Sequence, residues 1–222
     1  MKLSEKVNVL RASVMGANDG IVSVAGIVIG VAGATANNYA ILISGLSGML
    51  AGTVSMAMGE YVSVNAERDG QKRAITEESR ALDDDYQGEF DFIQHKYMKT
   101  GISGDLAKKA TGEMLSRDPL NVAVRERFGF DSGETTSAVA AAVSSMIAFP
   151  TGSILPLVAI TLFPAAIKLW ATVVAVVIAL TITGYIAAAL GNANRWKAAL
   201  RNVVSGILTM AVTYWIGTLF AH

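Results

Sequence analysis

Cysteine is absent from the 222 residues, and histidine occurs only twice. Without cysteine the chain can form neither disulfides nor thiolate metal sites, and it has no cysteine nucleophile. Methionine is then the only soft ligand that the sequence offers to a metal ion. Charge is scarce too, with 16% charged residues and a formal net charge of zero. Nothing therefore indicates a nucleic-acid partner, which would call for a basic face.

What remains is strongly apolar, with 52% hydrophobic residues and a mean hydropathy of +0.45. A bilayer core about 30 Å thick needs roughly 20 mainly apolar residues in helical form. Five long windows of low charge meet that length: residues 12–36, 38–60, 135–167, 169–194 and 202–221. We predict an all-α integral membrane protein with five transmembrane helices, the third of them broken by its prolines at 150, 156 and 164.

A polar segment separates the second span from the third. Residues 61–134 carry eleven basic and fifteen acidic residues, and turn signals occur at 83–88, 101–104 and 118–119. We expect a small helical acidic domain here, between membrane parts at 1–60 and 135–222. Lys and Arg gather before the first span, in this segment and between the fourth and fifth spans, so the positive-inside rule predicts a cytosolic N-terminus and an outside C-terminus. The short length and the lack of a targeting extension favour a bacterial inner membrane.

Asp19 interrupts the apolar text VMGANDGIVSVAGIVIGVAGA of the first span. An acid in mid-span costs about 2.5–3.5 kcal/mol, so such residues face a bundle interior or a water-filled path. Apart from Glu60, no other carboxylate lies within or at the edge of a span, and no Lys or Arg lies inside one. We therefore expect the partner of Asp19 to come from outside the protein, as a metal ion or a proton.

Four residues of the second span recur every fourth position and form one stripe on a helix: Gly48, Gly52, Met56 and Glu60. The glycines allow close helix approach, and the same face then offers a thioether and a carboxylate. Oxygen and sulfur together favour Fe²⁺ or Mn²⁺ over Mg²⁺ and Ca²⁺. Two other interpretations stay open: Met56 as a packing residue, and Glu60 as a residue that ends the span at the interface.

The helix of the second span is expected to continue past the membrane if Gly70 does not break it. Glu67 and Glu78 would then lie close to two and five whole turns after Glu60, forming an acidic row towards Met56. A solvated face is the ordinary role of such glutamates. The GxxxG pairs Gly16/Gly20 and Gly26/Gly30 indicate helix packing only.

Two stretches, ASVMGANDGIVSVAGIVIGVAGA and SGLSGMLAGTVSMAMGEYVSVNAERD, resemble the first two spans of the vacuolar iron transporter family, the Ccc1-like iron and manganese transporters. The five-span order, the charged insert and the length are similar as well. The resemblance implies a homodimer that moves Fe²⁺ or Mn²⁺ out of the cytosol in exchange for protons. It places the family's aspartate on Asp19 and its methionine on Met56, with Glu60 in a matching GEY element.

In plant members of this family the cytosolic domain gathers metal through glutamates on three helices. The first helix matches at Glu67 and Glu78. The later helices depart from the pattern, because Phe92 and His95 stand where acids are expected, and Arg127 stands beside Glu126 in place of a glutamate. The resemblance thus supports transport more strongly than metal storage in this domain.

We therefore expect an exporter of divalent transition metal, with metal ions, protons and lipid as its partners. The metal is its substrate, and no resident cofactor is expected. The alternative is a metal-binding membrane scaffold or sensor that binds metal without moving it. A membrane enzyme is disfavoured, because the spans contain neither a nucleophile and base pair nor a His-rich metal site.

Overall fold

The structure, a computed structural model, describes residues 3–133 and 136–221. The expected boundary at 134–135 and the terminal His222 lie outside the described residues. The described chain forms helices α1 (Leu3–Ala34), α2 (Asn38–Asp84), α3 (Tyr86–Lys99), α4 (Gly104–Arg117), α5 (Pro119–Phe128), α6 (Ala138–Leu162), α7 (Lys168–Leu190) and α8 (Arg195–Leu219). Helices α1, α2, α6, α7 and α8 are long and apolar enough to cross a membrane. The predicted all-α membrane fold with five spans is confirmed.

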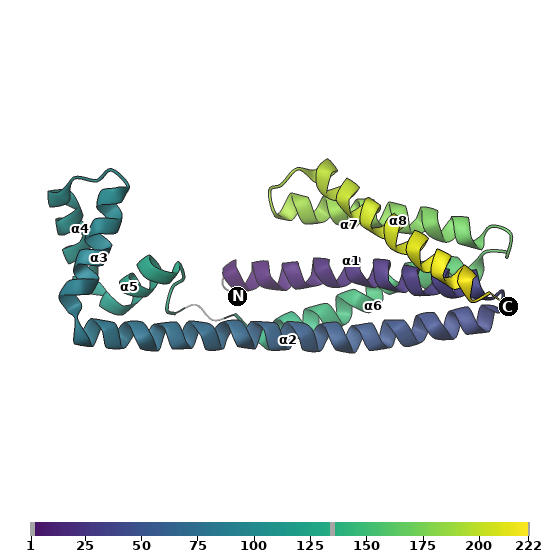
Figure 1. Cartoon of the computed structure of the whole chain (residues 1–222), viewed down its shortest axis with the longest axis horizontal. Helices are drawn as coiled ribbons and strands as arrows, with labels where there is room; N and C mark the ends of the chain where they lie inside the picture. The colour runs from purple at the N-terminus through teal and green to yellow at the C-terminus, as the bar shows by residue number, and fades with distance from the viewer. Residues whose placement is uncertain (1–2, 134–135, 222) are drawn as a thin grey trace. The chain divides into compact units, whose positions relative to one another are not determined.

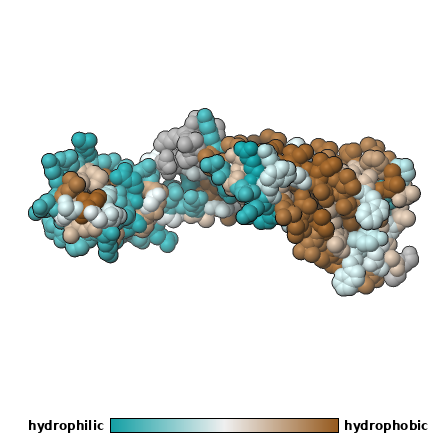
Figure 2. All heavy atoms as spheres, turned by 90° about the horizontal axis from the view of Figure 1, so that it is seen from above, coloured by the Kyte–Doolittle hydropathy of each residue, from teal (hydrophilic) through white to brown (hydrophobic). Residues whose placement is uncertain are grey.

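The chain divides into two compact units. The membrane unit consists of residues 1–63 and 137–222, and the polar unit consists of residues 64–136. Helix α2 contributes to both, because it is continuous across the boundary. Figure 2 shows the contrast in composition: hydrophobic side chains cover most of the visible face of the membrane unit, and hydrophilic ones dominate the polar unit.

Helix α1 is the centre of packing in the membrane unit, where it contacts α6, α7 and α8 (Figure 1). Its glycines make the close approaches possible. A Cβ on Gly20 would collide with the Phe149 carbonyl of α6, and one on Gly26 or Gly30 would press against threonines of α8. Both GxxxG pairs thus serve helix packing, as predicted, since small residues let two backbones approach.

Helix α2 presents its glycine stripe to the same bundle. A side chain at Gly48 would meet Ile27 of α1, and one at Gly52 would meet the ring of Phe149 on α6. The buried apolar core beneath this face comes from several helices and includes Val24, Val28, Phe149, Ile160, Val176 and Leu180. Close approach along the stripe is therefore confirmed for its two glycines.

The expected breaks at Pro150 and Pro156 are wrong, because α6 runs through both. Each proline removes one helical hydrogen bond, but a membrane helix tolerates this where neighbouring helices and hydroxyl side chains support the backbone. Here α6 lies directly against α1. Between the two prolines, Ser153 Oγ lies within hydrogen-bond distance of the Phe149 carbonyl of its own helix and of the Gly20 carbonyl of α1, so a hydroxyl joins the two helices at this point. The helix ends only at Leu162, before Pro164.

Two spans begin earlier than their apolar windows indicate. Helix α1 starts at Leu3 instead of residue 12, and α8 starts at Arg195 instead of residue 202. A search for uncharged residues truncates both helices, because long basic side chains are accepted at helix ends where their charge reaches the membrane surface. The early start of α1 places Arg11 on that helix.

In the polar unit, α3, α4 and α5 pack together around Ile93, Leu115, Val122 and Ala123. The turns fall where they were predicted. Asp85 caps α3 by accepting from the amide of Gly88, and Asp118 caps α5 by accepting from that of Asn121. These caps explain why the two helices begin where they do, since a carboxylate satisfies an amide that the first turn leaves unpaired.

Candidate functional site

Asp19 lies near the middle of α1, on a face that is exposed in the single chain. Ser23, one turn later, donates a hydrogen bond of 2.9 Å from its Oγ to Asp19 Oδ1. Among the described residues no basic side chain pairs with Asp19. The carboxylate is therefore positioned by its own helix and is open to a partner that the single chain does not supply.

Met56 lies half-buried on α2 and packs against the apolar core of the membrane unit. Met58, two residues later, is 55% exposed. The two methionines thus occupy different faces of the helix, as a spacing of two residues requires. Their environments make Met58 a matched control for any role of Met56.

Glu60 is buried, and Arg11 of α1 holds it. The distance from Arg11 Nη2 to Glu60 Oε2 is 3.4 Å, and the Arg11 side chain is 48% exposed. Sequence reasoning missed this pair because it placed Arg11 before the first span. The spacing in the sequence was the available signal. Arg11 precedes Asp19 by eight residues, about two helical turns, so a first span that begins slightly earlier includes both residues.

Asn18 is a second residue that sequence reasoning missed. Its side-chain oxygen accepts a hydrogen bond of 3.0 Å from Asn202 Nδ2 and one of 3.3 Å from Thr183 Oγ1. The three residues belong to α1, α8 and α7, so one amide joins three membrane helices. A polar amide beside Asp19 in an apolar window was the available signal, because polar side chains join helices in membranes.

Glu67 and Glu78 both lie on the continuous α2, which Gly70 does not break. Their environments differ: Glu67 is exposed, whereas Glu78 is 2% exposed. Arg127 of α5 binds Glu78, with 3.1 Å between Nε and Oε2, and its Nη2 lies 2.6 Å from both carboxylate oxygens of Glu89. The guanidinium of Arg127 also lies over the ring of Phe92, with 4.2 Å between Cζ and the ring centroid.

This cluster contains two buried carboxylates, Glu78 and Glu89, and one guanidinium whose side chain is 35% exposed. Burial raises the pKa of Glu78, and hydrogen bonding and repulsion from Glu89 raise it further, while Arg127 opposes the change. The second oxygen of Glu78, Oε1, has no hydrogen-bond partner among the described residues. The guanidinium of Arg127 therefore lies between Glu78 and Glu89 and pairs with both.

A second set of polar contacts joins α3 to α5. Glu126 accepts from Lys96 Nζ at 2.9 Å and from Tyr97 Oη at 2.8 Å. Burial opposes ionisation of Glu126, but these bonds and the positive charges of Lys96 and Arg125 outweigh it and lower its pKa. His95 is exposed and bonds through Nδ1 to the Asp91 carbonyl on its own helix.

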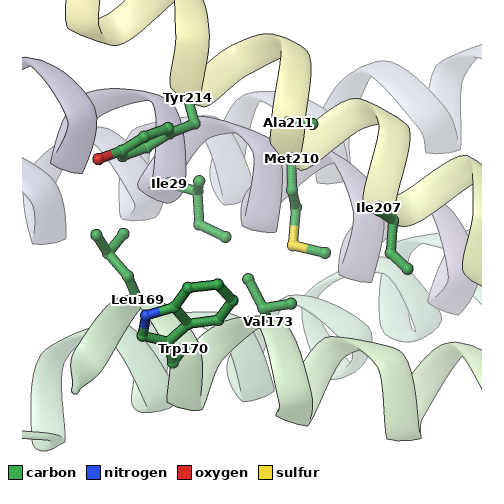
Figure 3. Close-up of a pocket in the computed structure, with 8 residues that line it drawn as sticks. All are labelled: Ile29, Leu169, Trp170, Val173, Ile207, Met210, Ala211 and Tyr214. Carbon is green, nitrogen blue, oxygen red and sulfur yellow. The ribbon is translucent and has the colours of Figure 1, made fainter.

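No group of three or more His, Asp or Glu side chains within residues 3–133 and 136–221 is arranged to hold a metal ion. The pocket in Figure 3 is not a metal site either. It has a volume of about 330 Å³, and its lining from α1, α7 and α8 is apolar, with Met210 as its only sulfur. Within the described part of the membrane unit, Asp19 contacts Ser23, Met56 packs against the apolar core and Glu60 pairs with Arg11.

Comparison with known proteins identifies the family. The VIT family model matches residues 10–218. The "Vacuolar iron transporter" of Acanthamoeba castellanii is 31% identical over 95% of this chain and 78% of its own length. "Vacuolar iron transporter homolog 1" of Oryza sativa subsp. japonica is 36% identical over 95% of this chain and 73% of its own length. "Vacuolar iron transporter homolog 3" of Arabidopsis thaliana is 31% identical over 95% of this chain and 82% of its own length. This chain belongs to the VIT family.

Proposed function

We propose that the protein exports divalent transition metal, Fe²⁺ or Mn²⁺, from the cytosol in exchange for protons. Membership of the VIT family and the names of its relatives support metal transport. The observation that carries the proposal is Asp19, a carboxylate near the middle of a membrane helix whose described partner is only a serine on the same helix. Such a charge is costly in lipid and is retained at ion pathways.

In this mechanism metal passes from the acidic polar unit to Glu60 and Met56, then to Asp19. Carboxylate and thioether ligands suit Fe²⁺ and Mn²⁺ better than Ca²⁺. Protons from the far side compete for the same oxygens, so metal leaves as they bind. Glu67 and Glu78 are proposed as collecting residues, with Glu78 accessible to metal only when it leaves Arg127.

A homodimer completes the proposal. Asp19 is exposed on the single chain, and a carboxylate facing lipid would cost about 2.5–3.5 kcal/mol. A second copy that covers this face removes that contact with lipid and brings a second Asp19 to the pathway. Opposed carboxylates from two copies would then face the same pathway and could bind one metal ion together.

We further propose a bacterial inner membrane, with the N-terminus in the cytosol and the C-terminus outside. The distribution of Lys and Arg supports the orientation of the two ends. It carries no information on the host membrane, and the named relatives are eukaryotic proteins. Reporter tags at the two ends should be accessible from opposite sides of the membrane. Accessibility of both from one side would contradict this orientation and the five-span topology.

Flux through reconstituted vesicles tests the function. Purified protein is placed in vesicles that contain a metal-sensitive dye or a pH dye, and Fe²⁺, Mn²⁺, Zn²⁺ and Ca²⁺ are added in turn. We expect uptake of Fe²⁺ or Mn²⁺ with an opposite movement of protons. Metal binding without flux would instead identify a scaffold or sensor, and flux without a pH change would remove the proton exchange.

A further inference from the structure

Arg11 forms an ion pair with Glu60, a carboxylate of the proposed cation pathway. Its guanidinium lies 3.4 Å from Glu60 Oε2, and the Glu60 side chain is only 9% exposed. A metal ion that binds Glu60 must therefore displace Arg11 or share the carboxylate with it.

The surroundings of Arg11 allow such a displacement. Besides Glu60, its Nη2 donates to Asn8 Oδ1 at 3.0 Å, and Nη1 donates to Met15 Sδ at 3.5 Å. Glu60 is its only acidic partner among the described residues. Asn8 and Met15 both belong to α1, the helix of Arg11 itself. Because the side chain is 48% exposed and keeps these contacts, the guanidinium can release Glu60 without being left unsolvated.

The position of Arg11 along α1 connects this contact to the pathway. Arg11, Met15 and Asp19 are spaced four residues apart and share one face of the helix. Eight residues of helix correspond to about 12 Å. The arginine thus lies about two turns from Asp19, on the side of the N-terminus, and it contacts the glutamate through which metal is proposed to enter.

We propose that Arg11 is the resident cation of Glu60, which competes with divalent metal for that carboxylate and sets the metal concentration at which the pathway fills. This inference rests on the proposed function of Glu60 as an entry ligand. For removal of Arg11, it predicts a change in metal affinity opposite to the change expected if the ion pair were only structural. Removing a competitor strengthens metal binding, whereas removing a structural pair weakens the fold and everything that depends on it.

Equilibrium binding of Mn²⁺ to the full-length protein in detergent, followed by Mn²⁺ flux in vesicles, tests the proposal. Arg11→Gln should lower the half-saturating Mn²⁺ concentration about two- to fivefold, as expected from losing a partly exposed ion pair. Arg11→Lys keeps the charge and should stay near the parent. In a Glu60→Gln background, Arg11→Gln should have no effect on Mn²⁺ binding, because the shared carboxylate is gone.

Weaker or unchanged Mn²⁺ binding by Arg11→Gln would overturn the competition, and so would an equal gain in the Glu60→Gln background. The two assays separate this inference from the proposed function. If Arg11→Gln tightens binding but no variant moves Mn²⁺, the competition stands and transport fails. If the parent transports Mn²⁺ and Arg11→Gln leaves its affinity unchanged, transport stands and the competition fails. Thermal stability of each preparation identifies a variant that has merely lost its fold.

Discussion

At the scale of single residues, Asp19 is the test of the mechanism. Asp19→Asn keeps the side-chain shape, and its amide oxygen can still accept the hydrogen bond from Ser23. The neutral variant avoids the cost of placing a charge within the membrane, so we expect equal or higher thermal stability in detergent. Transport of Fe²⁺ or Mn²⁺ should fall at least about tenfold, because a proton carrier and ligand is lost. Transport at the parental rate would show that Asp19 is no ligand.

Met56 and Met58 form a matched pair on α2. Met56→Ala removes a half-buried thioether on the glycine stripe, and Met58→Ala removes an exposed one on another face. If the thioether of Met56 binds metal, its removal should reduce Mn²⁺ or Fe²⁺ flux well beyond any loss of stability. A pure packing role predicts a loss of about 2 kcal/mol or more in unfolding free energy and no change in metal preference. Flux and thermal stability of both variants are measured side by side.

At the scale of elements, Asn18 holds α1 to α7 and α8. Asn18→Leu leaves Asn202 Nδ2 and Thr183 Oγ1 without this acceptor, and hydrogen bonds between membrane helices contribute about 0.6 kcal/mol each and at most about 1.7. We expect a loss of about 1–2 kcal/mol in unfolding free energy on this basis. Asn18→Leu combined with Asn202→Leu should recover part of it, because the amide of Asn202, one of the two donors left without an acceptor, is then replaced by an apolar side chain. No recovery in the double variant would argue against a direct bond.

The contact between α3 and α5 predicts a pH dependence. Hydrogen bonds from Lys96 and Tyr97 lower the pKa of Glu126 despite its burial. Its folded pKa therefore lies below the unfolded value, so its stabilisation is present above the unfolded pKa and is lost as pH falls through the folded one. Glu126→Gln should increase hydrogen exchange of α3 amides at pH 7, by about 1–2 kcal/mol in opening free energy. The difference from the parent should vanish in acid below that pKa; a constant difference would mean that Glu126 acts by packing.

At the scale of the whole molecule, the absence of cysteine provides a test of the dimer. Met15→Cys introduces the only thiol, one turn from Asp19 on the same face of α1, and Met15 is 48% exposed in the single chain. Oxidation in the membrane should give a cross-linked dimer if a second copy covers this face. Trp170→Cys, on α7 at a site 74% exposed, is the control and should stay monomeric on a denaturing gel. Equal cross-linking at both positions would remove this face as the interface.

The sequence alone determined the fold class and the five spans, and it singled out Asp19 as a candidate ligand. Lipid forces every backbone polar group into internal hydrogen bonds, so apolar length predicts helices, and a lone acid within one is conspicuous. Only the tertiary structure decided the partners of the other acids. Arg11 and Glu60 are 49 residues apart, and Arg127 and Glu89 are 38 apart. Which arginine reaches which carboxylate depends on how helices pack and where they begin, and hydropathy carries no information on either. The search for uncharged windows found the spans but excluded Arg11, because it began the first span at residue 12, whereas the helix already begins at Leu3.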